Sequence, residues 1–290
     1  WHRRGRAIIP VDAARGQRRY AACCFHLHGR VDLKLILGLG VLIALIIGAV
    51  LAGFYFGQRR LIYYPDMTRG DATIASTFDL VRPDGVHLRG WVDRPGQSRA
   101  LLYFGGNAET LQQARALLAE CCPGWTAYLV PYRGYGGSDG TPSSEAILAD
   151  ALALHDEVAK RHPGQPVALI GRSLGSGVAA HVAHQRDIDR LVLVTPYDRM
   201  RTLASLHYPW LPVGWLLREN YDSVDWLKDA RTPILIVRAG NDRVVPAAST
   251  DALLHALPAA TTREIIIPDA NHDSISTRSE YLEALSTFLR

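Results

Sequence analysis

Apolar, strand-like runs alternate with helical segments along most of this chain, and no other feature restricts its possible folds as much. "PVALIG" (166–171) and "PILIVRAG" (233–240) are two of these runs, and stretches with the apolar spacing of helices lie between them. Strands that are joined through helical crossovers form parallel sheets. Since the runs are apolar at nearly every position, helices are expected to cover both faces of the sheet. The pattern therefore predicts an α/β fold with a mostly parallel sheet.

The individual elements follow from the same pattern. "TFDLV" and "VHLRGWVD" are expected to pair around the turn at 83–85. Further strands are predicted at 100–104, 126–132, 166–171, 190–196, 233–240 and 263–268. Helices are predicted at 109–120, 143–162, 173–185, 247–257 and 278–290. Together these elements indicate one α/β domain over residues 57–290.

Residues 198–230 interrupt the alternation between two predicted strands. Three of the six Trp residues of the chain, Trp210, Trp215 and Trp226, fall in this insertion. Two interpretations carry equal weight: a helical insertion with a small core of its own, and a cap that lines an apolar substrate pocket. The two interpretations are compatible with each other.

Residues 35–56, "LILGLGVLIALIIGAVLAGFYF", contain no charged residue and no His. About 20 apolar residues cross a bilayer as a helix, and aromatic residues gather at one end of this run as they do at membrane interfaces. A buried core helix and a cleaved signal peptide are the alternatives. The run exceeds the ~7–15 apolar residues of a signal peptide, and no small-residue cleavage site follows it. We predict an uncleaved signal anchor, and hence a single-pass membrane protein.

The segment before this run, residues 1–34, is basic. It holds eight Lys and Arg, so the positive-inside rule predicts that the main domain lies on the non-cytoplasmic side. Because the chain begins with Trp1 and its first Met is Met67, we hypothesise that synthesis starts near Val31 at an alternative codon, which would shrink this charge bias. Residues 31–290 carry a net charge of −2 within an overall +4, so nucleic acid is not expected as a partner.

The stretch "GRSLGSG" (171–177) contains the pattern G-x-S-x-G around Ser173. A predicted strand precedes the serine and a predicted helix follows it, which is the arrangement of a nucleophile elbow. Gly171 and Gly175 leave room for the tight turn and for close packing of the helix on the sheet. The turn would present the serine hydroxyl at the carboxyl ends of the strands, where α/β sheets bind ligands.

A nucleophilic serine needs a base, and the base needs an orienting acid. Asp242 follows the strand at 233–240, and His272 follows the strand at 263–268, so both belong to the same edge of the sheet as Ser173. Taken alone, Asp242 is explained as a turn cap and His272 as a solvated loop residue. The order Ser, Asp, His at three strand ends instead predicts a catalytic triad.

An oxyanion hole requires two backbone N–H donors near the serine. Leu174, the residue after the nucleophile, is the first expected donor, and Asn107 in the loop "GGNAET" is the second. An ordinary glycine turn between strand and helix is the alternative for this loop. The chain contains no G-x-x-x-x-G-K-[ST] motif, so nucleotide binding is not expected. No metal and no organic cofactor are expected.

These motifs together resemble the α/β-hydrolase superfamily, and more narrowly its single-span, membrane-anchored serine hydrolases. The matching pieces are the span followed by "LIYYPD", then "YFGGNAET", "PYRGYGGSDGTPS", "GRSLGSG", "GNDRVVP" and "NHDS". The resemblance implies an α/β-hydrolase fold over residues 57–290, the triad of Ser173, Asp242 and His272, and the oxyanion donors Asn107 and Leu174. Members of the superfamily often carry His-Gly before the oxyanion residue, where this chain has Gly105-Gly106, so any role of that His side chain is lost.

We therefore expect a membrane-anchored serine hydrolase that cleaves acyl esters or thioesters through an acyl-enzyme intermediate. A peptidase that uses the same triad is one alternative. A catalytically silent membrane scaffold is another, although a scaffold has no need for all three triad residues. The expected partners are a small acyl substrate and the membrane.

Overall fold

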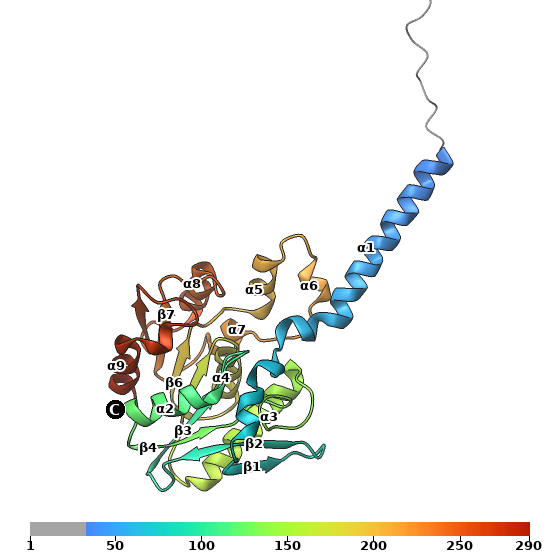
Figure 1. Ribbon diagram of the computed structural model, residues 1–290. Coiled ribbons are helices and arrows are strands. Elements are labelled where there is room, and N and C mark those ends of the chain that lie inside the picture. The colour runs from blue at the N-terminus through green and yellow to red at the C-terminus, as the bar shows by residue number, and fades with distance from the viewer. Residues whose placement is uncertain (1–32) are drawn as a thin grey trace, which may run out of the picture. The chain divides into compact units, whose positions relative to one another are not determined.

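The computed structural model describes residues 33–290 (Figure 1). The predicted basic segment as far as residue 32, together with the hypothesised start near Val31, lies outside the described residues. The chain divides into two compact units between Val50 and Leu51. The second unit, Leu51–Arg290, contains every residue that was predicted to take part in catalysis.

The second unit is built on an eight-stranded sheet. Its strands are β1 (Phe78–Val81), β2 (His87–Asp93), β3 (Arg99–Phe104), β4 (Trp125–Leu129), β5 (Val167–Arg172), β6 (Ile188–Val194), β7 (Ile234–Ala239) and β8 (Thr262–Ile267). The strand order is β1-β2-β4-β3-β5-β6-β7-β8. β1 and β2 pair antiparallel, β2 is antiparallel to β4, and every pair from β4 to β8 is parallel. The sheet is thus mostly parallel, as the sequence predicts.

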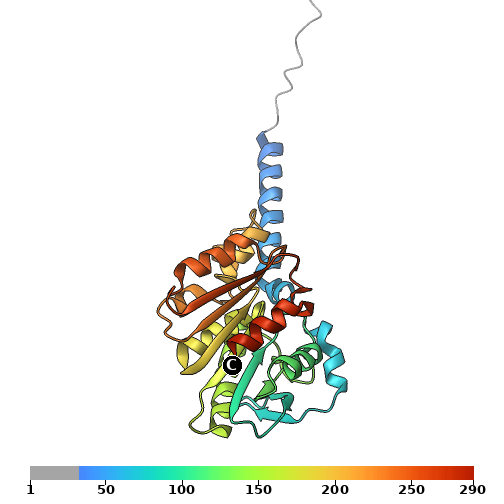
Figure 2. The ribbon, with the colours of Figure 1, turned by 90° about the vertical axis from the view of Figure 1, so that its left-hand side faces the viewer.

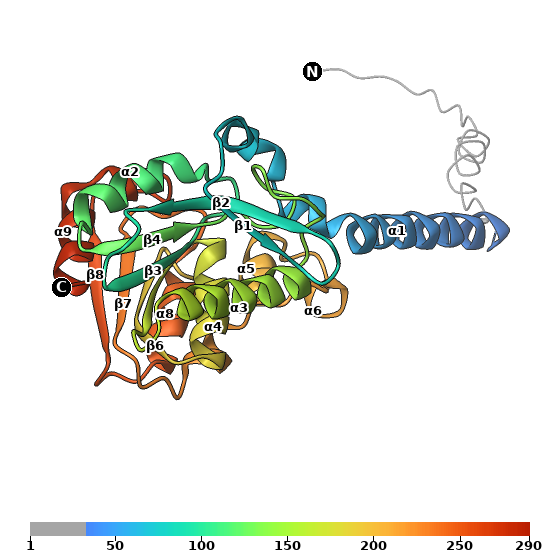
Figure 3. The same cartoon turned by 90° about the horizontal axis from the view of Figure 1, so that it is seen from below.

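Five helices cover the two faces of this sheet. They are α2 (Leu111–Cys121), α3 (Ser144–Arg161), α4 (Leu174–Gln185), α8 (Ala247–Ala256) and α9 (Ser279–Phe288). α2 and α9 lie on one face, whereas α3, α4 and α8 lie on the other (Figures 2 and 3). Each face buries its own apolar cluster, because successive side chains of a strand point to opposite sides.

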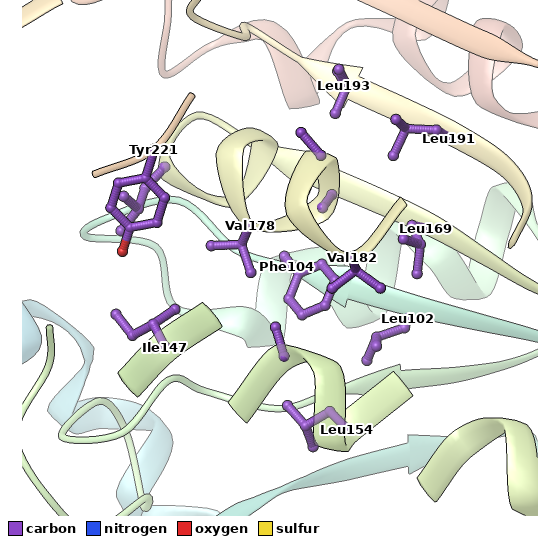
Figure 4. Close-up of a cluster of buried hydrophobic side chains, with 14 of the residues drawn as sticks. Leu102, Phe104, Ile147, Leu154, Leu169, Val178, Val182, Leu191, Leu193 and Tyr221 are labelled. Carbon is purple, nitrogen blue, oxygen red and sulfur yellow. The ribbon is translucent and has the colours of Figure 1, made fainter. Parts of the chain in front are cut away.

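Strand β3 illustrates this division. Leu102 and Phe104 pack into the cluster that α3 and α4 cover, where Val178 and Val182 meet them (Figure 4). Tyr103, between the two, belongs to the opposite cluster together with residues of α2 and α9. A fully buried side chain of this size stabilises the fold by about 1.5–3 kcal/mol relative to its exposed state. The continuous apolar runs of the sequence thus reflect burial on both faces.

Helix α1 (Leu33–Ile62) contains the run that was predicted to span a membrane. It is long and apolar enough for that purpose, and its apolar window is not buried within the protein. The helix continues for six residues beyond Phe56, where the predicted span ends, and a 3₁₀ helix at Pro65–Thr73 follows. Much of the expected connector "LIYYPD" is therefore helical.

The insertion at 198–230 lies between β6 and β7 and forms three short helices. These are α5 (Met200–His207), α6 (Val213–Leu216) and α7 (Ser223–Leu227). Tyr221 and Leu227 are buried in the core cluster of the main domain. The α7 end of the insertion therefore belongs to the domain core, and we call the segment from α5 to α6 the cap.

Candidate active site

Ser173 stands between the end of β5 and the start of α4, in a backbone conformation that residues with a Cβ seldom adopt. Its φ is 51° and its ψ is −116°. Non-glycine residues at positive φ are strained, and they persist where the surrounding structure enforces them. The helix packs so closely behind this turn that a Cβ on Gly171 would overlap the Gly175 carbonyl. The local sequence thus builds the sharp strand-to-helix turn that the motif predicts.

A continuous chain of hydrogen bonds joins Ser173, His272 and Asp242. His272 Nε2 lies 2.9 Å from Ser173 Oγ, and His272 Nδ1 lies 2.8 Å from Asp242 Oδ2. The second Asp242 oxygen accepts the backbone N–H groups of Val244 and Val245 at 2.9 and 2.8 Å, which fixes the carboxylate. The side chains of His272 and Asp242 are only 10% and 8% exposed. In such a site, the bonded carboxylate favours the tautomer in which Nε2 accepts the serine proton.

The expected oxyanion donors Leu174 and Asn107 come from the two loops that the sequence indicated. Leu174 is the first residue of α4, and Asn107 follows β3. In the described part of the chain, neither backbone N–H donates to a protein acceptor. A Cβ on Gly175 would overlap the Phe104 and Gly105 carbonyls, so the first turn of α4 lies directly against this loop. Both N–H groups therefore remain available to a ligand.

The Asn107 side chain has a role that the sequence does not reveal. Its Oδ1 accepts the Tyr135 hydroxyl at 2.7 Å and the Tyr64 backbone N–H at 3.2 Å. Tyr64 lies just after the end of α1, about 40 residues before Asn107. The loop that was predicted to supply an oxyanion donor is thus bonded to the segment that follows the apolar helix.

A second group that sequence reasoning missed lies behind the serine. Glu109 accepts the Gly106 backbone N–H at 2.6 Å and the Tyr103 hydroxyl at 2.8 Å. It also pairs with Arg172, whose Nη1 is 3.2 Å away and whose Nη2 donates to the His272 carbonyl at 3.1 Å. Both side chains are nearly buried, at 10% and 11% exposure. This ion pair connects the loop before α2, the serine turn and the histidine loop.

The charge of Arg172 is secured by this pairing. Burial disfavours the cation and would lower the pKa of Arg172, but the adjacent Glu109 carboxylate outweighs burial and raises that pKa above its usual value. Arg172 therefore stays a cation in this contact. In the sequence, Arg172 occupies a position of G-x-S-x-G at which any residue is allowed, and Glu109 stands at the start of a predicted helix. No motif therefore identifies either residue as part of the site.

The described residues include no cluster of three or more His, Cys, Asp or Glu side chains that could hold a metal ion. The groups that the site presents are a hydroxyl, an imidazole, a carboxylate and backbone N–H groups. These are the parts needed for nucleophilic attack on a carbonyl carbon with stabilisation of the oxyanion.

Comparison with known proteins relates this arrangement to a family. Residues 100–225 match the family model described as serine aminopeptidase, S33. An uncharacterized protein of Mycobacterium tuberculosis (strain CDC 1551 / Oshkosh) is 32% identical over 243 residues, which cover 80% of this chain and 86% of the relative. The lysophosphatidylserine lipase ABHD12 of Danio rerio is 28% identical over 179 residues, which cover 54% of this chain and 47% of that protein.

Solved structures extend the comparison to the fold. An esterase of Pyrococcus furiosus matches with a TM-score of 0.61 at 16% identity, covering 77% of this chain and 94% of the esterase. Alpha/beta hydrolase domain-containing protein 10 from mouse matches with a TM-score of 0.57 at 18% identity, covering 74% and 97%. At these identities the likeness concerns the fold alone. It confirms the fold that the resemblance in the sequence implied.

Proposed function

The chain belongs to the α/β-hydrolase superfamily, and from this premise we propose that it is a membrane-anchored serine hydrolase that cleaves acyl esters or thioesters. The observation that carries the proposal is the hydrogen-bonded series from Ser173 through His272 to Asp242 at the carboxyl edge of the sheet. A strained serine turn beside two unused backbone donors supports the same chemistry.

The reaction would proceed in two halves. In the first, His272 Nε2 takes the Ser173 proton as Oγ bonds to the substrate carbonyl carbon, and the N–H groups of Leu174 and Asn107 stabilise the oxyanion. The tetrahedral intermediate then expels the alcohol or thiol, which receives the proton from His272. In the second half, His272 deprotonates a water molecule that attacks the acyl-enzyme, and the free acid leaves. Asp242 holds the imidazole in place and stabilises its cation throughout.

Acyl esters are favoured over peptides as substrates on two grounds. One relative is named as a lysophosphatidylserine lipase, and one protein with a matching fold is an esterase. These names describe the substrates of those two proteins. The apolar α1 helix would also hold the enzyme beside lipid esters. A peptidase remains the second candidate because the matching family model is described as a serine aminopeptidase. Relative turnover of an acyl ester and an aminoacyl amide would separate the two.

The decisive experiment is covalent labelling of the full-length protein in detergent with a fluorophosphonate, beside Ser173→Ala. Labelling of the parent alone would establish an activated serine, and esters of increasing acyl length would then define the substrate. A parent that is folded yet unlabelled would overturn the proposed chemistry and favour the scaffold alternative. Thermal unfolding of both proteins serves as the control for folding.

Membrane anchoring is part of the same proposal, with the catalytic domain on the non-cytoplasmic side. The length and composition of α1 support the anchor, and the excess of basic residues before the span supports the orientation. Protease added to intact spheroplasts should digest the catalytic domain. Digestion only after lysis would reverse the orientation, and release of the protein by alkaline carbonate would contradict the anchor.

A further inference from the structure

The cap is bonded to the last turns of α1, within the unit Leu51–Arg290. The buried Gln58 side chain donates to the Leu216 carbonyl at 3.1 Å and accepts the Arg218 backbone N–H at 2.7 Å. The next residue, Arg59, pairs with the buried Glu219 at 2.8 Å. These polar contacts hold residues 216–219 against the helix in a defined register. The depth of the cap along α1 is therefore fixed by the fold.

Aromatic contacts extend this junction into the predicted span. The Phe54 ring meets Tyr208 at 6.2 Å and Trp210 at 5.5 Å between ring centroids, both edge to face. Phe54 lies two residues before Phe56, the end of the uncharged run. A helix rises about 1.5 Å per residue, so Phe54 stands roughly 3 Å inside that end. If α1 crosses the bilayer, Tyr208 and Trp210, which pack on Phe54, therefore lie at the boundary of the hydrocarbon layer.

The cap presents large apolar side chains to its surroundings at this level. Trp215 is 91% exposed and Trp210 is 64% exposed, while Leu206 and Tyr208 are also exposed. We call these four residues of the cap the aromatic face. Trp and Tyr are the side chains that favour the level of lipid headgroups. Full exposure of such rings to water would be unfavourable, whereas a bilayer interface would bury them.

An apolar cavity lies between α1 and the cap. Its volume is about 80 Å³, which is room for a small part of a ligand and not for a whole lipid. The side chains around it are almost all apolar and come from the end of α1 and from residues 204–217; they include Phe54, Leu61, Ile62, Tyr208, Leu211 and Leu217. Such a lining suits a hydrocarbon chain and offers almost nothing to a polar ligand.

We propose that the aromatic face enters the bilayer leaflet from which α1 emerges, and that the small apolar cavity beside it receives the end of an acyl chain from that leaflet. The inference rests on the proposed membrane anchor. A lipid surface is the occupant that the geometry favours, because the anchor itself places a bilayer at the level of Phe54. Arg218, which is exposed and lies over the Tyr55 ring at 5.5 Å, stands at the polar edge of this face, where lipid phosphates would meet it.

Fluorescence quenching tests the depth of the aromatic face. The full-length protein would be reconstituted into vesicles of phosphatidylcholine and phosphatidylglycerol that carry bromine atoms on their acyl chains. We expect strong quenching of Trp emission in the parent and loss of most of it in the double variant Trp210→Phe/Trp215→Phe. Trp226→Phe is the matched control, because Trp226 lies in the same insertion but packs on His181 with 4.8 Å between ring centroids.

Activity provides a second readout. Trp210→Ala/Trp215→Ala should hydrolyse a long-chain acyl glycerol ester embedded in vesicles about tenfold more slowly than the parent, since buried apolar area determines interfacial binding. Hydrolysis of a water-soluble short-chain ester should stay at the parental rate. Equal loss on both substrates would mean that the variant is damaged elsewhere and would overturn the proposed role in lipid uptake.

The outcomes separate this inference from the proposed function. Failure of the parent to float with vesicles would contradict the anchor itself. Flotation with equal quenching in the parent and the double Phe variant would leave the anchor intact and refute the aromatic face as a membrane contact. A parent without activity on either ester would contradict the proposed hydrolase, while the quenching result would still decide the membrane contact.

Discussion

Glu109 and Glu219 are two carboxylates that bind the same three kinds of donor in different regions of the domain. Glu109, behind the serine, accepts a backbone N–H, a tyrosine hydroxyl and an arginine. Glu219, at the junction of α1 and the cap, also accepts a backbone N–H, from Ser144, a tyrosine hydroxyl, from Tyr63, and an arginine. Each carboxylate thereby holds several separate segments together.

The two regions differ in what their arginines do. Arg172 is 11% exposed and continues to the His272 carbonyl, so the Glu109 group ends on the catalytic loops. Arg59 is 48% exposed and lies on the helix that leads to the predicted span. The same arrangement of charges thus lies beside the proposed catalytic residues in one place and beside the proposed anchor in the other. Substitutions in the first region should reduce turnover, whereas substitutions in the second should reduce stability.

The largest effect is expected at Asp242, which bonds directly to His272, the proposed catalytic base. Asp242→Asn should lower kcat/KM by about 10⁴, because an amide favours the wrong imidazole tautomer while keeping the shape of the side chain. Steady-state kinetics on a soluble ester would measure it. Asp269→Asn, three residues before His272 and not bonded to it, is the matched control and should retain parental activity. A variant of Asp242 with parental kinetics would remove this residue from the proposed triad.

The next effect tests Glu109 as a positioning residue. Glu109→Gln should lower kcat by about 10², since small displacements of catalytic groups have effects of that size. KM should change little because no substrate contact is removed. Glu120→Gln, an exposed change on α2, the helix that follows the Glu109 loop, is the control for surface charge. A parental kcat would show that Gly106 and Arg172 keep their positions without this carboxylate, and a loss that follows thermal stability alone would indicate a purely structural role.

These two substitutions also mark how far sequence reasoning reaches. The positions of the strands along the chain and the placement of Asp242 after one of them followed from periodicity, because apolar strands and the loops after them are local patterns. The contact between Glu109 and Arg172 is not local: the residues stand 63 positions apart and meet only through the pairing of β3 with β5. Burial of an ion pair depends on that tertiary packing, so no short sequence motif predicts it.

Two predicted element boundaries differ from those in the structure, and each difference has a physical reason. The strand predicted at 126–132 ends at Leu129, two residues before Pro131, which has no N–H for a sheet ladder. The connector expected at Leu61–Asp66 is instead largely helical, because α1 continues to Ile62 and a 3₁₀ helix begins at Pro65. Tertiary partners stabilise this end of α1, since Gln58 bonds to the Leu216 carbonyl and the Arg218 N–H, and no local sequence pattern identifies such partners.

A smaller effect is expected where the two regions meet. Asn107→Ala keeps the backbone N–H but removes the oxygen that binds Tyr135 and the Tyr64 backbone. Loss of about one net hydrogen bond, ~1 kcal/mol, corresponds to roughly a five- to tenfold decrease in kcat if it is felt in the transition state. Tyr135→Phe removes only one donor and should lie between the parent and Asn107→Ala. An identical kcat in the parent, Asn107→Ala and Tyr135→Phe would show that the contact between the Asn107 loop and the segment after α1 does not affect turnover.

The smallest effect on turnover is expected at Glu219. Glu219→Gln should leave kcat on a soluble ester near the parental value but destabilise the domain by about 1–3 kcal/mol, because a buried acceptor of three donors becomes an amide. Urea unfolding of the detergent-solubilised protein would measure the free energy. Glu145→Gln, an exposed change at the start of α3, is the matched control. Loss of activity larger than loss of stability would erase the distinction between the two regions.

The pH dependence of this last variant identifies the cause of its destabilisation. Burial alone would raise the pKa of Glu219, but hydrogen bonds from Arg59, Tyr63 and the Ser144 N–H outweigh burial and lower that pKa below its ordinary 4.5. A lowered pKa in the folded state means that the unfolded state binds more protons, so the carboxylate stabilises the fold above pH 4.5. This stabilisation is lost as the pH falls through the folded pKa. The difference between parent and Glu219→Gln should therefore be full near neutral pH and shrink in acid. A difference independent of pH would instead assign the effect to packing.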